Sequence, residues 1–167
     1  MRTISGLVGF LAAFAAQNGC GFALEVTRSI DIEAPPAAVW ALIGDFCAIE
    51  KWHPLVKRCT ISNSRDDDEG KPVAIRHLVA AGGLGTIVEV QTMRDEKAMS
   101  YSYAFVEGPL PVSAYNATIS VKPNGAKTTV VWTATFDAAG MTDAEAKADI
   151  EDVYKQGLAS IAKDTSR

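Results

Sequence analysis

Two oppositely charged residues stand at positions that a short hairpin would bring together. If Ala80 pairs with Gly85 across the turn between them, Arg76 lies directly opposite Glu89. Both charges then share a sheet face with Leu78, which predicts that this face is the inner one. Opposite charges on an apolar face are costly unless they pair. We therefore consider two interpretations. Arg76 offers a forked donor to a ligand carbonyl or carboxylate, or the two residues form a partly exposed cross-strand salt bridge.

The chain has two histidines, His53 and His77, and their spacing does not match a metal-binding motif. No partner nucleophile accompanies His53, so we expect it to be a surface hydrogen-bonding group, with proton transfer as the alternative. We expect His77 to point outward. A G-x-S-x-G elbow and a phosphate-binding glycine loop are both missing from the sequence. We predict no metal and no cofactor, and we favour binding over catalysis without deciding whether the protein is an enzyme.

Composition limits the class of protein. The 167 residues are 48% hydrophobic and 22% charged, which is ordinary for a globular domain. The net charge of −4 offers no basic patch that would neutralise phosphates, which argues against a nucleic-acid partner.

The first 23 residues have the pattern of a secretory signal peptide. Arg2 precedes an apolar run over Leu7–Ala16. Gly21 and Ala23 then provide small residues at the two positions that a signal peptidase recognises. The run is too short to span a bilayer. We predict cleavage after Ala23 and a periplasmic or secreted protein. Lipid attachment at Cys20 is the weaker alternative, because Gln17 stands where a lipoprotein signal has an aliphatic residue.

Cleavage would leave two cysteines, Cys47 and Cys59, in an oxidising compartment. They either form a disulfide, worth about 2–3 kcal/mol for so short a loop, or remain as two buried thiols.

The elements that would position these residues begin with a long C-terminal helix. Thr142 and Glu145 form a capping box, and an apolar stripe with three- and four-residue spacing continues to about Lys163. Gly157 interrupts this helix at a cost of about 1 kcal/mol relative to alanine. Either a neighbouring group, a side chain or a ligand, needs room beside the helix, or the helix packs tightly on the sheet.

Most of the remaining chain has the period-two alternation of strands. A first strand over Val26–Glu33 precedes a short helix that ends at Gly44 and a second short helix or turn over Asp45–Trp52. We expect Trp40 to be a buried anchor of the first helix. Six further strands are expected near Arg58–Ser64, Val73–Ala80, Gly85–Met93, Ala98–Val106, Val112–Lys122 and Lys127–Asp137. The result is an α+β fold in which a curved, seven-stranded antiparallel sheet surrounds the long helix.

Several motifs resemble one superfamily. The run Ser29–Trp40, followed by Ile43–Phe46 and Trp52–Pro54, resembles the SRPBCC superfamily. Within it, the chain is similar to the polyketide cyclase/dehydrase-like branch of the START and Bet v 1-like helix-grip fold. Further matches are Arg76, Val88-Glu89, Tyr101–Tyr103, Glu107–Val112 with Tyr115, Trp132–Phe136 and Tyr154–Leu158. The resemblance implies a single helix-grip domain over 24–167.

The resemblance also implies a function. We expect an exported, cofactor-free protein that binds a small, largely apolar molecule between the sheet and the C-terminal helix. One alternative is a cofactor-free cyclase- or dehydratase-like enzyme that uses acid–base chemistry. The other is a periplasmic accessory protein of a dehydrogenase system, similar to those of methanol oxidation, with a periplasmic protein partner. After signal cleavage we expect no membrane association.

Candidate ligand-binding residues come from the expected inner faces and the cavity mouth. Trp52 and His53 lie where the short helices meet the sheet, and Tyr101 and Tyr103 share a face whose direction one bulge would reverse. The full set is Trp52, His53, Arg76, Glu89, Tyr101, Tyr103, Tyr115, Trp132 and Gly157.

Overall fold

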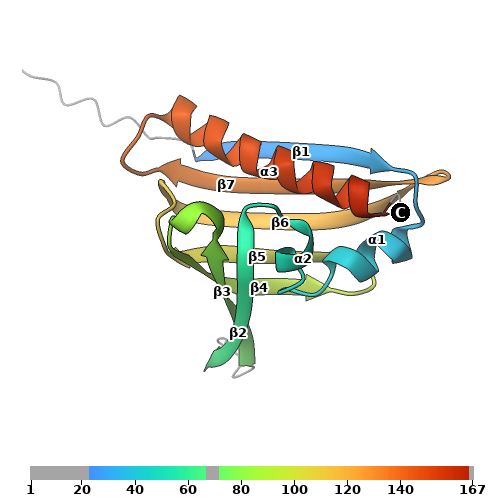
Figure 1. Ribbon diagram of the computed structural model, residues 1–167, viewed down its shortest axis with the longest axis horizontal. Helices are drawn as coiled ribbons and strands as arrows, with labels where there is room; N and C mark the ends of the chain where they lie inside the picture. Colours follow the sequence, from blue (N-terminus) through green and yellow to red (C-terminus); the bar gives the residue numbers. More distant parts are fainter. Residues whose placement is uncertain (1–22, 67–71, 166–167) are drawn as a thin grey trace, which may run out of the picture.

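The computed structural model describes residues 23–66 and 72–165 (Figure 1). The expected signal peptide lies outside the described residues except for its last position. Within the described part of the chain, no helix is long and apolar enough to cross a membrane.

One antiparallel sheet of seven strands forms the frame, in the order β1-β7-β6-β5-β4-β3-β2. Figure 1 shows the sheet curving strongly, with β2 and β3 turned away from the direction of β1 and β7. The strands are β1 (Leu24–Ile32), β2 (Val56–Asp66), β3 (Pro72–Ala80), β4 (Thr86–Asp95), β5 (Ser100–Glu107), β6 (Val112–Asn124) and β7 (Lys127–Ala138). The predicted seven-stranded helix-grip architecture is confirmed, with strand ends that differ by only a few residues.

Two short helices, α1 (Pro36–Ile43) and α2 (Ile49–Trp52), connect β1 to β2, and a 3-10 turn, η1 (Ala81–Gly83), connects β3 to β4. Val39 and Ile43 are the buried residues of α1. The prediction that Trp40 is a buried anchor is wrong. Its ring is only half-buried, because its indole N–H reaches outward to the Glu96 carboxylate at 2.8 Å.

A disulfide between Cys47 and Cys59 joins the segment between α1 and α2 to β2. Their Cα atoms are 5.5 Å apart, and the two residues are separated by 12 positions. A loop of this length is worth about 3 kcal/mol in the chain-entropy model of disulfide stabilisation. Of the two alternatives for the cysteines, the structure has the bonded one.

The long helix α3 (Asp143–Thr165) lies across the concave side of the sheet (Figure 1). Its start is the predicted capping box. The Thr142 backbone N–H donates to the Glu145 carboxylate at 3.0 Å, and the Glu145 N–H donates to the Thr142 hydroxyl at 3.3 Å. The predicted apolar stripe is buried, through Ala146, Ile150, Tyr154, Gly157, Leu158 and Ile161.

Gly157 lets two large side chains approach the helix backbone. A Cβ atom at this position would lie 2.7 Å from His53 Cδ2 and 2.9 Å from Trp132 Cζ3. The space that we expected beside Gly157 is therefore filled by protein side chains. Of the alternatives that we considered, the structure favours close packing of side chains against the helix over room for a ligand.

We predict that Gly157→Ala destabilises the protein by roughly 1–2 kcal/mol, since overpacking outweighs the gain of about 1 kcal/mol in helix propensity. Urea unfolding followed by circular dichroism measures the change. The exposed neighbour Lys155 provides a control, because Lys155→Ala should alter the free energy of unfolding by less than about 0.5 kcal/mol. An unchanged or higher unfolding midpoint for Gly157→Ala would contradict the prediction.

Candidate functional site

A largely apolar cavity of about 150 Å³ lies between the sheet and α3. A cavity of roughly this volume is large enough for one benzene ring. Its apolar wall consists of Ile49, Leu55, Val56, Leu78, Ala80, Ala81, Leu84, Ile87, Leu110, Ile150 and Val153. Its polar and aromatic wall consists of His53, Arg76, Glu89, Tyr103, Tyr115, Trp132 and Tyr154.

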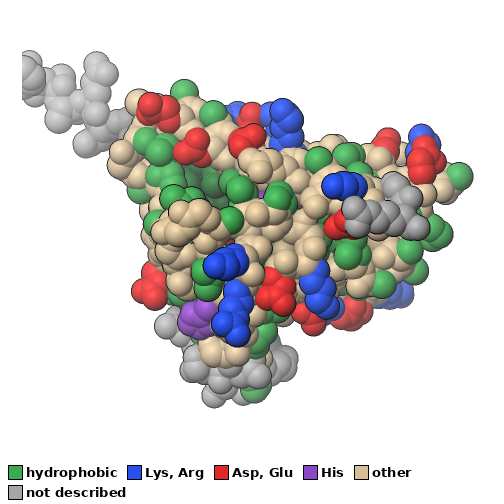
Figure 2. Space-filling model, in the orientation of Figure 1, with side chains coloured by type: hydrophobic (Ala, Val, Ile, Leu, Met, Phe, Trp, Pro, Cys, Tyr) green, Lys and Arg blue, Asp and Glu red, His purple; other side chains and the backbone are tan. Residues whose placement is uncertain are grey.

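Leucines from different parts of the chain surround the mouth of the cavity. Leu55 precedes β2 and is 36% exposed, Leu84 follows η1 and is 73% exposed, and Leu110 lies between β5 and β6. Figure 2 shows hydrophobic side chains gathered around a hollow between α3 and η1. These leucines together form apolar surface at one opening, which an apolar molecule can cover.

The predicted register of the β3–β4 hairpin is confirmed, and Arg76 pairs directly with Glu89. Arg76 Nε donates to Glu89 Oε2 at 2.6 Å, and Arg76 Nη1 donates to the Phe46 carbonyl oxygen at 2.8 Å. The guanidinium lies between two rings, with its Cζ 4.2 Å from the Phe46 centroid and 4.5 Å from the Tyr103 centroid. The interpretation as a partly exposed salt bridge is wrong, because the Arg76 side chain is completely buried.

The carboxylate, rather than the guanidinium, is the member of this pair with accessible surface. The Arg76 side chain is 0% exposed and the Glu89 side chain is 7% exposed. Burial is the largest single influence on the pKa of Arg76 and lowers it, but Glu89, Tyr101 and Tyr103 together raise this pKa by more. The net shift is upward, so the guanidinium stays charged. Within the described part of the chain, Arg76 Nη2 has no hydrogen-bond partner.

Three tyrosines and a tryptophan form the aromatic part of this wall. The Tyr115 and Tyr154 hydroxyl oxygens are 2.5 Å apart, and the Trp132 indole N–H donates to the Tyr103 hydroxyl at 3.0 Å. The Trp132 and Tyr154 rings are stacked, with centroids 4.1 Å apart. Burial raises the pKa of all three tyrosines, which keeps their hydroxyls neutral. These groups can orient a ligand by hydrogen bonds and ring contacts.

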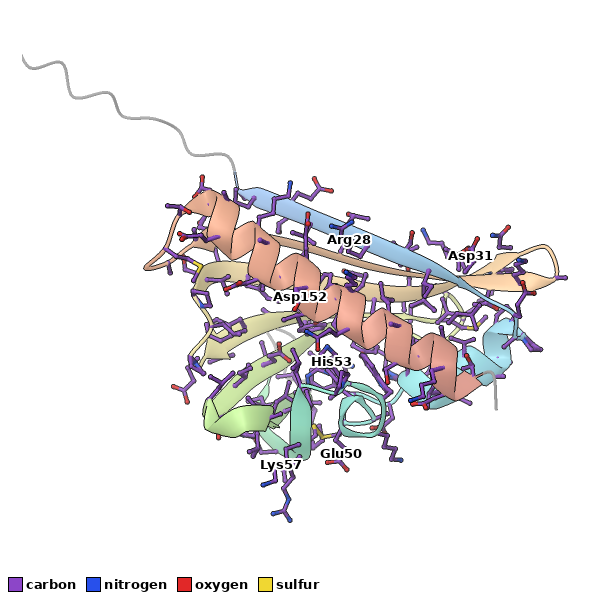
Figure 3. All side chains as sticks on the ribbon, turned by 45° about the horizontal axis from the view of Figure 1, so that its top comes forward. Arg28, Asp31, Glu50, His53, Lys57 and Asp152 are labelled. Atoms are coloured by element: carbon purple, nitrogen blue, oxygen red, sulfur yellow. A yellow bond between two sulfur atoms is a disulfide. The ribbon has the colours of Figure 1, made fainter. Side chains whose placement is uncertain are left out.

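His53 is buried, so the expectation of a surface hydrogen-bonding group is wrong. Figure 3 shows it beneath the middle of α3, between the helix and the sheet. Its Nε2 lies 3.1 Å from the Val153 carbonyl oxygen and therefore carries the proton, while Nδ1 accepts from the Leu55 N–H at 3.2 Å. Burial lowers the pKa of His53 to about 4, which makes the ring neutral at neutral pH.

The structure brings six of the nine candidate residues to the cavity wall: His53, Arg76, Glu89, Tyr103, Tyr115 and Trp132. The other three, Trp52, Tyr101 and Gly157, are buried behind it. Tyr101 and Tyr103 both point inward, which settles the direction of their face. Sequence reasoning missed Tyr154, although it is the one aromatic residue in the apolar stripe of α3.

His77, which we expected to point outward, is half-buried, and its Nε2 lies 3.0 Å from the Ser62 hydroxyl. Among residues 23–66 and 72–165, no group of histidine, cysteine and acidic side chains is arranged to hold a metal ion.

This chain is similar to known proteins over most of its length. The family model described as polyketide cyclase / dehydrase and lipid transport matches residues 23–165. A protein from Thermobifida fusca is 36% identical, with 86% of this chain and 93% of that chain covered and a TM-score of 0.72. The protein XoxI from Bacillus cereus is 28% identical, with coverage of 85% and 95% and a TM-score of 0.74.

The Zhui aromatase/cyclase from a Streptomyces species has a TM-score of 0.65, with 87% of this chain and 95% of that chain covered. Its sequence identity is 19%, so this likeness shows the shared fold alone.

The pKa of His53 predicts a specific loss of stability in acid. The unfolded chain protonates His53 near pH 6.5, whereas the folded protein does so only near pH 4. The stability that neutral His53 contributes is therefore complete above pH 6.5 and is lost as the pH falls toward 4, by roughly 3 kcal/mol in total.

Urea unfolding between pH 7 and pH 4 should show a steeper loss of stability for the wild type than for His53→Gln. His77→Gln, which removes the other histidine of the chain and lies outside the cavity wall, is the matched control. Parallel curves for the wild type and His53→Gln would contradict the assignment of a buried, neutral imidazole.

Proposed function

The chain belongs to the polyketide cyclase / dehydrase and lipid transport family, and we propose that it binds one small, largely apolar molecule in the cavity beneath α3. One observation carries this proposal: an apolar cavity of about 150 Å³ has a leucine-lined mouth and a few buried polar groups in its wall. Concave apolar sites with a small number of placed polar groups are the usual form of small-molecule sites.

Burial of a ligand's apolar surface supplies the affinity in this proposal. Each square ångström of apolar surface removed from water contributes about 25 cal/mol. Leu84 and Leu55 at the mouth would lose exposed surface as the ligand enters, and the aromatic side chains of the wall would supply further apolar contact area. The tyrosine hydroxyls and Glu89 would then set its orientation.

Binding is a better proposal than acid–base catalysis because the candidate proton-transfer groups are already engaged. Both nitrogens of His53 are hydrogen-bonded to the backbone. The three wall tyrosines have raised pKa values and are poor bases at neutral pH. Arg76 is held by Glu89 and by the Phe46 carbonyl. Glu89 is the group on which a cyclase-like activity would depend.

Ala81 offers a way to close the cavity without disturbing the core, because it lies half-buried at the mouth in η1. We predict that Ala81→Phe weakens the binding of ethylbenzene at least about tenfold, since the ring would occupy the ligand's space. NMR titration of the labelled protein measures the affinity. Ala38→Phe, at an exposed position of α1 away from the cavity, is the control.

Two results would count against binding in this cavity. One is equal affinity of the Ala81→Phe and wild-type proteins for ethylbenzene, with both shown to be folded by circular dichroism. The other is shift changes that cluster away from the wall residues.

We also propose that the protein works outside the cytoplasm. The signal-like pattern of residues 1–23 supports export, and the Cys47–Cys59 disulfide is consistent with an oxidising compartment. β1 begins at Leu24, so cleavage after Ala23 would leave every strand intact.

Terminal sequencing of the exported protein should accordingly give Leu24 as the first residue. Recovery of mature protein that begins at Met1, or that carries lipid on Cys20, would overturn the export proposal but not the ligand-binding proposal.

A further inference from the structure

We infer that the cavity selects a neutral ligand that carries a hydrogen-bond donor, such as the hydroxyl of a phenol or cyclic alcohol, which the Glu89 carboxylate accepts, and that it rejects carboxylates. This inference rests on the proposed function, because it specifies the ligand of the same cavity.

The orientation of the buried ion pair is the first argument. Arg76 contributes to the wall, but its guanidinium lies between the Phe46 and Tyr103 rings and has no exposed surface. Glu89 keeps 7% of its side chain exposed and lines the cavity. A ligand therefore meets the carboxylate before it can meet the guanidinium, which is the reverse of the role that the sequence indicated for Arg76.

The capacity of the carboxylate to accept is the second argument. Arg76 Nε uses Glu89 Oε2, at 2.6 Å, but a carboxylate has about four lone-pair positions. The remaining lone pairs can accept a hydrogen bond from a ligand donor, but they cannot pair with a ligand acceptor. A hydroxyl that donates to an ionised carboxylate makes a charge-assisted bond, roughly twice as strong as a bond between neutral groups.

The charges around the cavity argue against an anionic ligand. Among the described residues that line the cavity, Arg76 is the one cation and Glu89 is the one anion, and these two charges already neutralise each other. His53 is uncharged at neutral pH, and the wall tyrosines remain neutral hydroxyls. A second carboxylate beside Glu89 would be repelled in a medium that screens charge poorly.

The volume of the cavity argues for a single ring. At about 150 Å³ the cavity has room for one substituted ring. A para-substituted benzene can place an alkyl group toward the leucine mouth and a hydroxyl toward Glu89.

Four matched compounds test the inference in the full-length mature protein at pH 7: ethylbenzene, 4-ethylphenol, 4-ethylanisole and 4-ethylbenzoate. Calorimetry or NMR titration gives their affinities. We expect 4-ethylphenol to bind about tenfold more tightly than 4-ethylanisole, which lacks the donor, and 4-ethylbenzoate to bind most weakly.

Two variants connect the preference to Glu89. Glu89→Gln removes the negative charge and leaves Arg76 uncompensated, so 4-ethylbenzoate should bind more tightly than it does to the wild type. The double change Arg76→Met with Glu89→Met removes both charges together, which avoids an unpaired buried ion and protects folding. In this double variant the affinity ratio of 4-ethylphenol to 4-ethylanisole should fall to about one.

The control is Glu107→Gln, which removes one negative charge from the exposed end of β5 without changing the cavity wall. It should keep the wild-type ratios.

The outcomes separate the two proposals. If 4-ethylphenol and 4-ethylanisole bind equally well, or if 4-ethylbenzoate binds most tightly, this inference is overturned while ligand binding in the cavity stands. If none of the four compounds binds to the folded protein, both proposals are overturned. Retention of the phenol preference in a folded double variant would also overturn the role of Glu89.

Discussion

A buried ion pair, Arg76 with Glu89, joins the parts of this protein that surround the cavity. Through it, β3 bonds to β4, the Phe46 carbonyl between α1 and α2 is tied to the sheet, and Tyr103 of β5 packs on the guanidinium. Removing one partner of such a pair typically lowers the free energy of unfolding by about 3–5 kcal/mol, because the other charge is then buried without a partner or water. Cation–π contacts of about 1–2 kcal/mol each help to offset the desolvation of the arginine. The pair thus constrains both the core and the chemistry that the cavity can offer.

The cavity exists because α3 is held to the sheet at particular points. His53 donates to the Val153 carbonyl, and together with Trp132 it fills the space left by Gly157. Near the mouth, the wall consists of leucines from three separate segments of the chain. The disulfide anchors Cys47, the residue after Phe46, to β2, which helps to keep the Phe46 carbonyl in place beside Arg76. His53 and Trp132 thus pack against the helix and also line the cavity.

The family and its helix-grip fold indicate a hydrophobic ligand-binding or polyketide cyclase-like protein. They do not specify the ligand, which depends on the side chains that line the cavity. In this chain the groups that would act as acids or bases are mostly committed to structural hydrogen bonds. What remains at the cavity surface is apolar, aromatic or neutral, with one carboxylate that is paired with a buried arginine. This distribution favours recognition of a neutral ring over transformation of a charged substrate.

The sequence by itself determined the local and periodic features of the protein. Period-two alternation located the strands, the Thr142–Glu145 box located the start of α3, and turn spacing set Arg76 opposite Glu89. These features depend on neighbours within a few residues or across one hairpin, so they can be predicted from the sequence alone. Only the tertiary structure decided that His53 is buried, that Trp40 is half-exposed, and that Glu89 rather than Arg76 has surface at the cavity. Those outcomes depend on contacts between segments as distant as His53 and Val153, and on the curvature of the sheet that brings them together. No local pattern encodes which of two paired side chains lies nearer to a cavity, because that order is set by what packs behind them.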